Sequence, residues 1–86
     1  GMNGVNVKRR PASELMDAEA VYGVYGVIEW VALIRSGGAT LRVHFEGGSM
    51  TGFGVIPATF STRNRVISEM IMNSQAYRDG KIHRIR

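Results

Sequence analysis

The sequence contains no cysteine, which excludes a disulfide framework and a zinc site built from thiolates. It has only two histidines, His44 and His83, so a metal site would need carboxylates that converge from other parts of the chain. It also lacks an apolar run near the roughly 20 residues of a membrane-spanning helix, and its first residues lack the apolar core of a signal peptide. We therefore expect a cytoplasmic or virion-associated protein that uses no metal and no other cofactor.

Length and the first residues suggest the domain organisation. Gly1 before Met2 is typical of a residue left when an expression tag is removed. The 86 residues suffice for one domain, and a domain of this size buries only about 60–70% of its unfolded surface. Residues 1–12 are polar and basic. We therefore predict a flexible basic arm over residues 1–12 and a single domain over residues 13–86, whose small core favours oligomerisation.

Two Gly-Gly pairs divide the stretch from Val24 to Pro57 into three strand-like segments. They occupy residues 37–38 and 47–48, and glycine readily adopts the positive φ angles that both central residues of a type I′ hairpin turn require. If both pairs form two-residue turns, the register places apolar residues opposite each other: Trp30/Phe45, Ala32/Val43, Ile34/Leu41 and Phe45/Met50. The pattern predicts a three-stranded antiparallel meander with one continuous apolar face.

The segment after Pro57 carries a helical pattern. Thr62 is suited to cap the start of a helix, and Gly80 is suited to end one. Residues 81–86 are predicted to form a short fourth strand. Residues 13–21 fit a short helix and residues 22–26 a ragged start to the first strand, so the sequence leaves helix or strand open for residues 13–23. The apolar stripe of the helix comprises Val66, Ile67, Met70 and Ile71. The sequence thus predicts an α+β fold in which one helix covers the apolar face of the meander.

The opposite face of the predicted meander is unusually apolar. A solvent-facing antiparallel sheet normally alternates to polar residues, and only the middle strand does so here. Because a single helix covers one face only, the second face needs another molecule to cover it. The predicted interface consists of Val27, Val31, Leu33, Phe53 and Val55. We predict a structural or interaction protein that self-associates or docks a partner protein.

The positive charge indicates nucleic acid as an alternative partner. The net charge is +4, the positive charge is concentrated at the two ends of the chain, and basic ends can neutralise phosphates. Residues 51–56 also resemble the RNP1 element of RNA-recognition motifs, whose aromatic residues stack on bases. They differ from it at Thr51, where the element has a basic residue, and at Val55, where it has a second aromatic. The candidate nucleic-acid residues are Lys8, Arg9, Arg10, Arg42, Phe53, Arg84 and Arg86.

Catalysis has little support in the sequence. In the predicted register Glu29 faces Glu46, and His44 lies two residues from Glu46 on the same face. Paired carboxylates can perform acid–base chemistry, but a pair near a strand end is more often simply solvated. Neither Ser49 nor Ser61 lies in a nucleophile motif. We therefore predict that the protein is not an enzyme and has no catalytic residues.

The C-terminal half resembles a group of small proteins. The residues that carry the resemblance follow a predicted hairpin, and they are Phe60, Thr62, Asn64, Ile67, Ile71, Ser74, Tyr77, Gly80 and Ile82. The pattern is similar to small uncharacterised proteins of phage and prophage origin, in which a β-hairpin leads through a Phe-x-Thr turn into a short helix. The resemblance spans residues 39–82 and implies a virion-associated or assembly role without catalytic residues.

Overall fold

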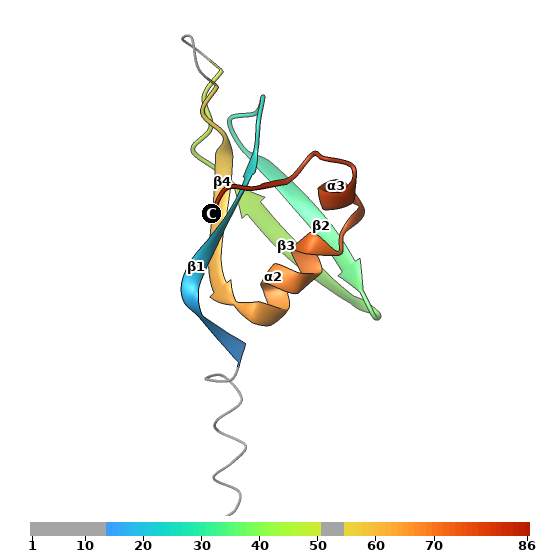
Figure 1. Ribbon diagram of the computed structural model, residues 1–86. Helices are drawn as coiled ribbons and strands as arrows, with labels where there is room; N and C mark the ends of the chain where they lie inside the picture. Colours follow the sequence, from blue (N-terminus) through green and yellow to red (C-terminus); the bar gives the residue numbers. More distant parts are fainter. Residues whose placement is uncertain (1–13, 51–54) are drawn as a thin grey trace, which may run out of the picture.

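The computed structural model describes residues 14–50 and 55–86 and shows an α+β fold (Figure 1). Its elements in chain order are β1 (Leu15–Val24), β2 (Trp30–Ser36), β3 (Ala39–Phe45), β4 (Ala58–Asn64), α2 (Arg65–Met72), α3 (Gln75–Arg78) and β5 (His83–Arg84). The predicted fold class is therefore confirmed, with antiparallel strands and a small helix packed on them. Among the described residues, no helix combines the length and the apolar character needed to cross a bilayer.

The first hairpin has the predicted register. β2 pairs with β3 so that Trp30 lies opposite Phe45 and Ile34 lies opposite Leu41. The turn between them is formed by Gly37 and Gly38, whose φ angles of 56° and 84° are both positive. Local turn chemistry and apolar alternation therefore determine this hairpin together.

The third strand of the predicted meander is wrong, because the second Gly-Gly pair does not form a tight turn. Gly47 has a φ of 82°, whereas Gly48 does not adopt a positive φ and donates its N–H to the Ile28 carbonyl at 2.9 Å. Residue 46 instead bridges to residue 59, and residue 49 bridges to residue 56. Residues 51–54, which include Phe53, lie outside the described residues. The next strand is β4, and it pairs with β1 instead of continuing a meander with β3.

The segment whose prediction was left open is the centre of a sheet. β1 lies between β4 and β5, so residues 15–24 form a strand, and the short-helix interpretation is wrong. Both edges of β1 are paired: Val21 donates its N–H to the Arg86 carbonyl at 3.0 Å, and Tyr22 lies opposite Phe60 of β4. Strand pairing with segments distant in the sequence decides the conformation of β1, and local propensity does not.

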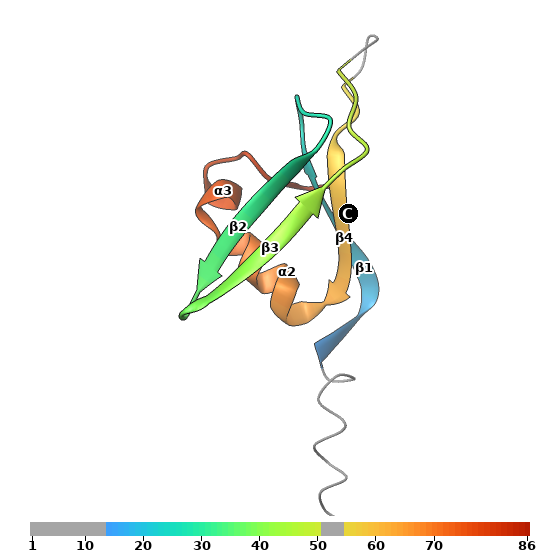
Figure 2. The same cartoon turned by 180° about the vertical axis from the view of Figure 1, so that it is seen from behind.

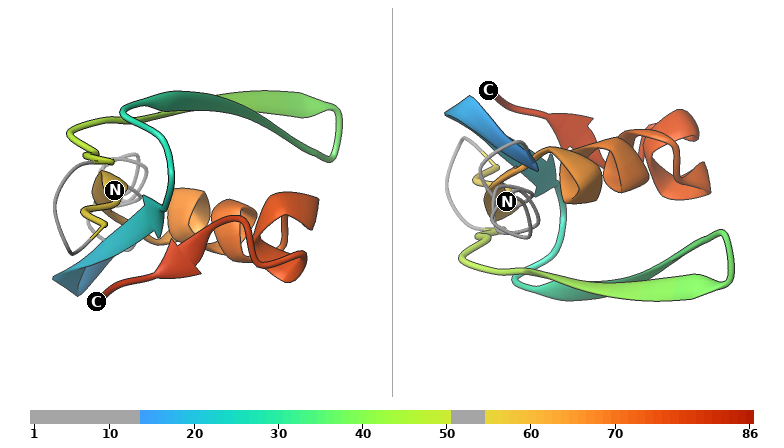
Figure 3. Two further views of the ribbon diagram at one scale, coloured as in Figure 1. Left: turned by 90° about the horizontal axis from the view of Figure 1, so that it is seen from above. Right: turned by 90° about the horizontal axis from the view of Figure 1, so that it is seen from below.

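The two sheets are joined into one curved surface around α2. An antiparallel bridge between Glu46 and Thr59 connects the end of β3 to β4. Figure 2 shows β2 and β3 side by side, crossing the helices, and Figure 3 shows this hairpin on one side of α2 and α3, with β1 and β5 beside the helices. The buried core between them includes Ala20, Tyr22, Val24, Ala32, Ile34, Val43, Phe45, Ala58, Ile71 and Ile82.

A polar pair is buried within this apolar core. The hydroxyl groups of Tyr22 and Ser68 hydrogen bond to each other, and both residues are almost inaccessible to solvent. The Tyr22 ring also meets Tyr77 edge to face, with ring centroids 6.2 Å apart. Because a buried hydroxyl without a partner is costly, this contact fixes the position of α2 on β1.

The helix begins later than the sequence predicts. Thr62 belongs to β4, where it lies opposite Ala20, and its hydroxyl accepts the N–H of Asn64 at 3.0 Å. Asn64 is the N-cap, because its side-chain oxygen accepts the Ile67 N–H at 3.0 Å. The prediction that Thr62 caps the helix is therefore wrong, and Asn64, two residues later at the end of β4, is the cap.

The chain ends as predicted in a turn and a short strand. Gly80, with a φ of 86°, follows α3, and Lys81 donates its N–H to the Ala76 carbonyl at 2.9 Å. Ile82 is then 1% exposed, and β5 pairs with β1 through residues 83–84. The predicted closing strand is thus confirmed, and Ile82 anchors it in the core.

Replacing Asn64 with alanine is expected to destabilise the protein by about 1 kcal/mol, because the first turn of α2 loses its side-chain acceptor. For a domain of this size the melting temperature should fall by roughly 4–8 °C, which thermal unfolding followed by circular dichroism measures. Asn64→Asp is the matched control, since it keeps an acceptor oxygen and should melt close to the unsubstituted protein. Equal melting of all three would show that the cap contributes nothing.

Candidate functional site

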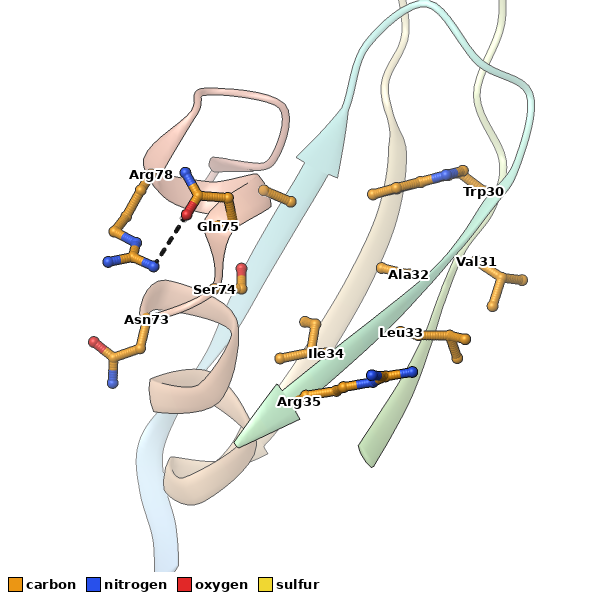
Figure 4. Close-up of a pocket in the computed structure, with 11 residues that line it drawn as sticks. Trp30, Val31, Ala32, Leu33, Ile34, Arg35, Asn73, Ser74, Gln75 and Arg78 are labelled. Atoms are coloured by element: carbon orange, nitrogen blue, oxygen red, sulfur yellow. Dashed lines mark hydrogen bonds between the residues drawn. The ribbon is translucent and has the colours of Figure 1, made fainter. Parts of the chain in front are cut away.

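A cavity of about 470 Å³ lies between β2 and the segment that joins α2 to α3 (Figure 4). β2 contributes six consecutive residues to its lining, from Trp30 to Arg35. The helical side contributes Asn73, Ser74, Gln75, Ala76 and Arg78. A wall made of consecutive strand residues includes the strand's backbone edge as well as one of its faces, so we call this cavity the β2 groove.

The edge of β2 that faces the groove carries free backbone groups. In an antiparallel pair only alternate residues bond to the partner strand, and a two-residue turn places the first such pair at Ser36 and Ala39. The backbone groups of Val31, Leu33 and Arg35 therefore point away from β3. Within residues 14–50 and 55–86, no backbone hydrogen bond joins these three residues to a further segment. Among the residues that the structure describes, β2 is thus a sheet edge without a partner strand on this side.

The side chains of β2 alternate between the core and the solvent. Ala32 and Ile34 are each 4% exposed and belong to the core, whereas Leu33 is 63% exposed. Figure 4 shows Val31 and Leu33 directed away from the helices. The inward residues therefore supply an apolar floor next to the edge, and the outward residues lie on the solvent side.

The charges that line the groove are positive. Arg35 and Arg78 are the charged residues among those that line it. Arg78 donates to the side chain of Gln75 at 3.3 Å, and the ammonium group of Lys81 lies 4.7 Å from the centre of the Trp30 ring. The groove is therefore lined by two arginines, Arg35 and Arg78, and the ammonium group of Lys81 lies next to a third lining residue, Trp30.

Two carboxylates adjacent in sequence to residues that line the groove already have partners. Asp79 accepts a hydrogen bond from the Gln75 side chain at 2.6 Å, and Glu29 lies 2.7 Å from Nε2 of His44. Neither carboxylate lines the groove. The groove therefore offers positive charge to a ligand without a lining carboxylate to neutralise it.

The structure separates the residues of the predicted interface. Val31 and Leu33 lie together on the outer face of β2, opposite His44 and Arg42 of β3. Val27 packs against the core instead of joining them, and Val55 is in the loop that precedes β4. Phe53 lies outside the described residues. The outer face of the hairpin is consequently more polar than the sequence suggests, and its apolar part is confined to β2.

Other exposed apolar side chains gather where the loops after β1 and β3 meet. Gly48 bonds to Ile28, and residue 49 bridges to residue 56, so the two loops lie against each other (Figure 1). The side chains of Ile28, Met50, Val55 and Ile56 are each more than half exposed. The predicted Val55 contact therefore belongs to this loop end and not to the hairpin face.

The described candidate nucleic-acid residues do not form one patch along the sheet. Arg42 is on β3, whereas Arg84 is on β5, and β1 and β4 lie between these strands. Arg84 is also engaged locally, because its Nε donates to the Arg86 carbonyl at 2.7 Å and its guanidinium lies over the Tyr22 ring. Lys8, Arg9 and Arg10 lie outside the described residues.

The structure brings together only two of the three residues considered for acid–base chemistry, Glu29, Glu46 and His44. Glu29 contacts His44, but their side chains are 65% and 45% exposed, and Glu46 takes part in a backbone bridge to Thr59. Among the residues that the structure describes, no cluster of three or more histidine or acidic residues is placed to hold a metal ion. An exposed imidazole–carboxylate pair is ordinary surface electrostatics.

Sequence reasoning missed the helical side of the groove. The residues from Asn73 to Ala76, and Arg78, are not among the site residues that the sequence predicts. One local signal was present: Ser74 caps α3 by accepting the Tyr77 N–H at 3.3 Å, and serine is a preferred N-cap. That signal predicts the short helix, but the approach of α3 to β2 depends on the tertiary fold.

Comparison with known proteins leaves the site to be interpreted from its own chemistry. No protein-family model, no curated protein and no solved structure matches this chain.

Proposed function

We propose that this protein is a non-enzymatic interaction module that binds another polypeptide through the β2 side of its hairpin. The observation that carries the proposal is the uncovered edge of β2 beside a groove with an apolar floor. Free strand edges are templates for pairing with a further chain, and proteins usually block such edges when pairing is not wanted. The exposed Leu33 adds apolar surface at the same place.

The size and composition of the protein fit a docking role. A small domain can bind another polypeptide in this way, because pairing at a strand edge uses backbone groups that every strand has. The proposed setting is the cytoplasm or an assembling virion, where a compact adaptor can join larger components. Self-association through the same edge is the other form that this function can take.

The test replaces Leu33 with proline. Because the Leu33 N–H points away from β3, proline removes a donor at the free edge without breaking the hairpin, and edge strands tolerate proline at such positions. A random-peptide display library is selected on the immobilised full chain, and the recovered peptides are measured against both proteins. We expect micromolar peptides whose affinity falls at least about tenfold in the variant.

Thr40→Pro is the matched control. Thr40 lies opposite Arg35 on β3, so its N–H faces the other side of the hairpin. Peptide binding should survive this change. Selection of no binding peptide, together with light scattering that shows only monomers, would refute the proposed function.

A further inference from the structure

The β2 groove has the dimensions of a short extended peptide. From Val31 to Arg35 the strand rises about 13 Å, and a neighbouring strand would lie about 4.8 Å from it. Three residues along this length present both an N–H and a carbonyl to the groove. An added strand of about five residues would satisfy all of them, as in other cases of recognition by strand addition.

We infer that the β2 groove binds an acidic, extended segment of a partner protein, which adds to β2 as an antiparallel strand. The inference rests on the proposed function and specifies the chemistry of the ligand. All the described strand pairs in this protein are antiparallel, and antiparallel pairing is slightly more stable per residue than parallel pairing. Residues of the added strand would alternate between the groove floor and the solvent side.

The apolar floor of the groove favours a ligand whose inward side chains are apolar and of modest size. Ala32 and Ile34 form its strand side and are already 4% exposed, and Ala76 lies across from them. Every second residue of the added strand points toward this floor, because side chains alternate along a strand. A valine at these positions would bury apolar surface without displacing the core.

The charge of the groove selects acidic residues at the alternate positions. The Arg35 side chain shares the solvent side with Val31 and Leu33, so it lies beside the outward residues of an added strand. Arg78 comes from the helical wall, where Figure 4 shows its side chain beside Gln75 and directed away from β2, and Lys81 lies near Trp30. The neighbouring carboxylates Asp79 and Glu29 are held by Gln75 and His44 and line no part of the groove.

A second copy of the chain fits this groove less well than an acidic partner. Pairing of two β2 strands about a two-fold axis would bring two copies of Arg35 and two of Arg78 into one interface. No carboxylate lines the groove of either copy to offset these charges. Like charges brought together across strands are destabilising, whereas carboxylates of a partner would pair with them.

The experiment uses defined peptides and the full chain. The probe is the acetylated, amidated peptide Glu-Val-Glu-Val-Glu-Val-Glu with a fluorescent label, and its match is the same peptide with lysine in place of glutamate. Binding is followed by fluorescence anisotropy at physiological salt. We expect the acidic peptide to bind and the basic one to bind at least roughly tenfold more weakly, the size expected for several exposed charge contacts.

Two further tests locate the contact. In nuclear magnetic resonance spectra, the amides of Val31, Leu33 and Arg35 should shift and exchange more slowly with solvent when the acidic peptide is added. In an antiparallel addition, the peptide residues opposite these three direct their backbone amides to β2. The side chains of the same peptide residues point to solvent, which is the side expected for the glutamates. Methylation of the glutamate amides should abolish binding, whereas methylation of the valine amides should spare it. These tests do not depend on any variant of the protein folding correctly.

Charge reversal then tests the role of the arginines. Arg35→Glu combined with Arg78→Glu should reverse the preference, so that the lysine peptide binds better than the glutamate peptide. Arg65→Glu reverses one positive charge at the start of α2, outside the groove, and should leave the preference unchanged.

Each contrary result has a distinct meaning. If the glutamate and lysine peptides bound equally well at the β2 edge, the inference of an acidic ligand would be wrong, and the proposed function would still stand. Unchanged binding of a peptide methylated on its glutamate amides would overturn the antiparallel addition, and so would shifts that avoid β2. A dimer in light scattering that Leu33→Pro dissociates would identify a second copy as the occupant. Tight binding of a single-stranded oligonucleotide in the groove would instead assign it to nucleic acid. Each of these results would overturn the inference.

Discussion

Replacing Gly48 with alanine is expected to destabilise the protein by at least about 3 kcal/mol, a large part of the roughly 4–13 kcal/mol that holds a domain of this size together. A Cβ at this position would overlap the Val27 carbonyl oxygen and lie 2.9 Å from the Ala58 nitrogen. Both neighbours are backbone atoms, so no side-chain rotation can relieve the overlap. The shift would also break the 2.9 Å hydrogen bond from Gly48 to Ile28.

Gly47→Ala provides the matched control one residue away. Gly47 has a φ of 82°, which alanine adopts at a cost of about 1–2 kcal/mol, but nothing lies within 4 Å of the added methyl group. Urea unfolding of both variants, followed by circular dichroism, compares a packing cost with a conformational cost. If Gly48→Ala were as stable as Gly47→Ala, the close approach of the two loops would be incorrect.

Replacing Ile71 with aspartate is expected to prevent cooperative folding. Ile71 lies on α2, is 0% exposed and belongs to the core between the helix and the curved sheet. The change removes a buried apolar side chain, at about 2–5 kcal/mol, and adds the cost of burying a carboxyl group without a partner. Together these costs match or exceed the expected stability of the domain.

Val66→Asp controls for the effect of an acidic residue on the same helix. Val66 is 46% exposed and lies in the first turn of α2, where a carboxylate interacts favourably with the helix dipole. This variant should melt cooperatively, near the temperature of the unsubstituted protein. A soluble Ile71→Asp variant with a sharp melting transition would contradict the packing of α2 on the sheet.

The parts of the fold that were predicted correctly depend on local signals. Gly37 and Gly38 supply the turn, and the alternating residues around them supply the register, so the β2–β3 hairpin follows from residues close in sequence. The apolar stripe that includes Ile71 likewise predicts a helix, and this prediction does not depend on which surface the helix packs against. Turn chemistry and periodicity carry enough information for these elements.

The errors concern pairing between segments that are distant in sequence. Gly47-Gly48 resembles a second tight turn, and only the position of Val27, which precedes Gly48 by 21 residues, shows that Gly48 is needed for close approach. β1 has no strong pattern of its own, because both its edges and its inner face are covered by later parts of the chain. No local rule separates these cases before the tertiary structure is known.

The candidate site was predicted only in part for the same reason. Val31 and Leu33 were correctly placed on the face of β2 away from the helix, because strand alternation determines the face. The groove was not predicted, because it forms where Asn73 to Arg78 approach β2. An open edge is likewise a property of the assembled sheet.

The order of the strands has a consequence for synthesis of the chain on the ribosome. Tyr22 leaves the exit tunnel early, but its two neighbours in the sheet, Phe60 and Arg84, are made much later. The middle strand must therefore wait unpaired while most of the polypeptide is translated, and such distant pairings slow folding. During this interval its bare edges are exposed to other nascent chains, so high expression should favour aggregation, which slower translation or a holdase chaperone would reduce.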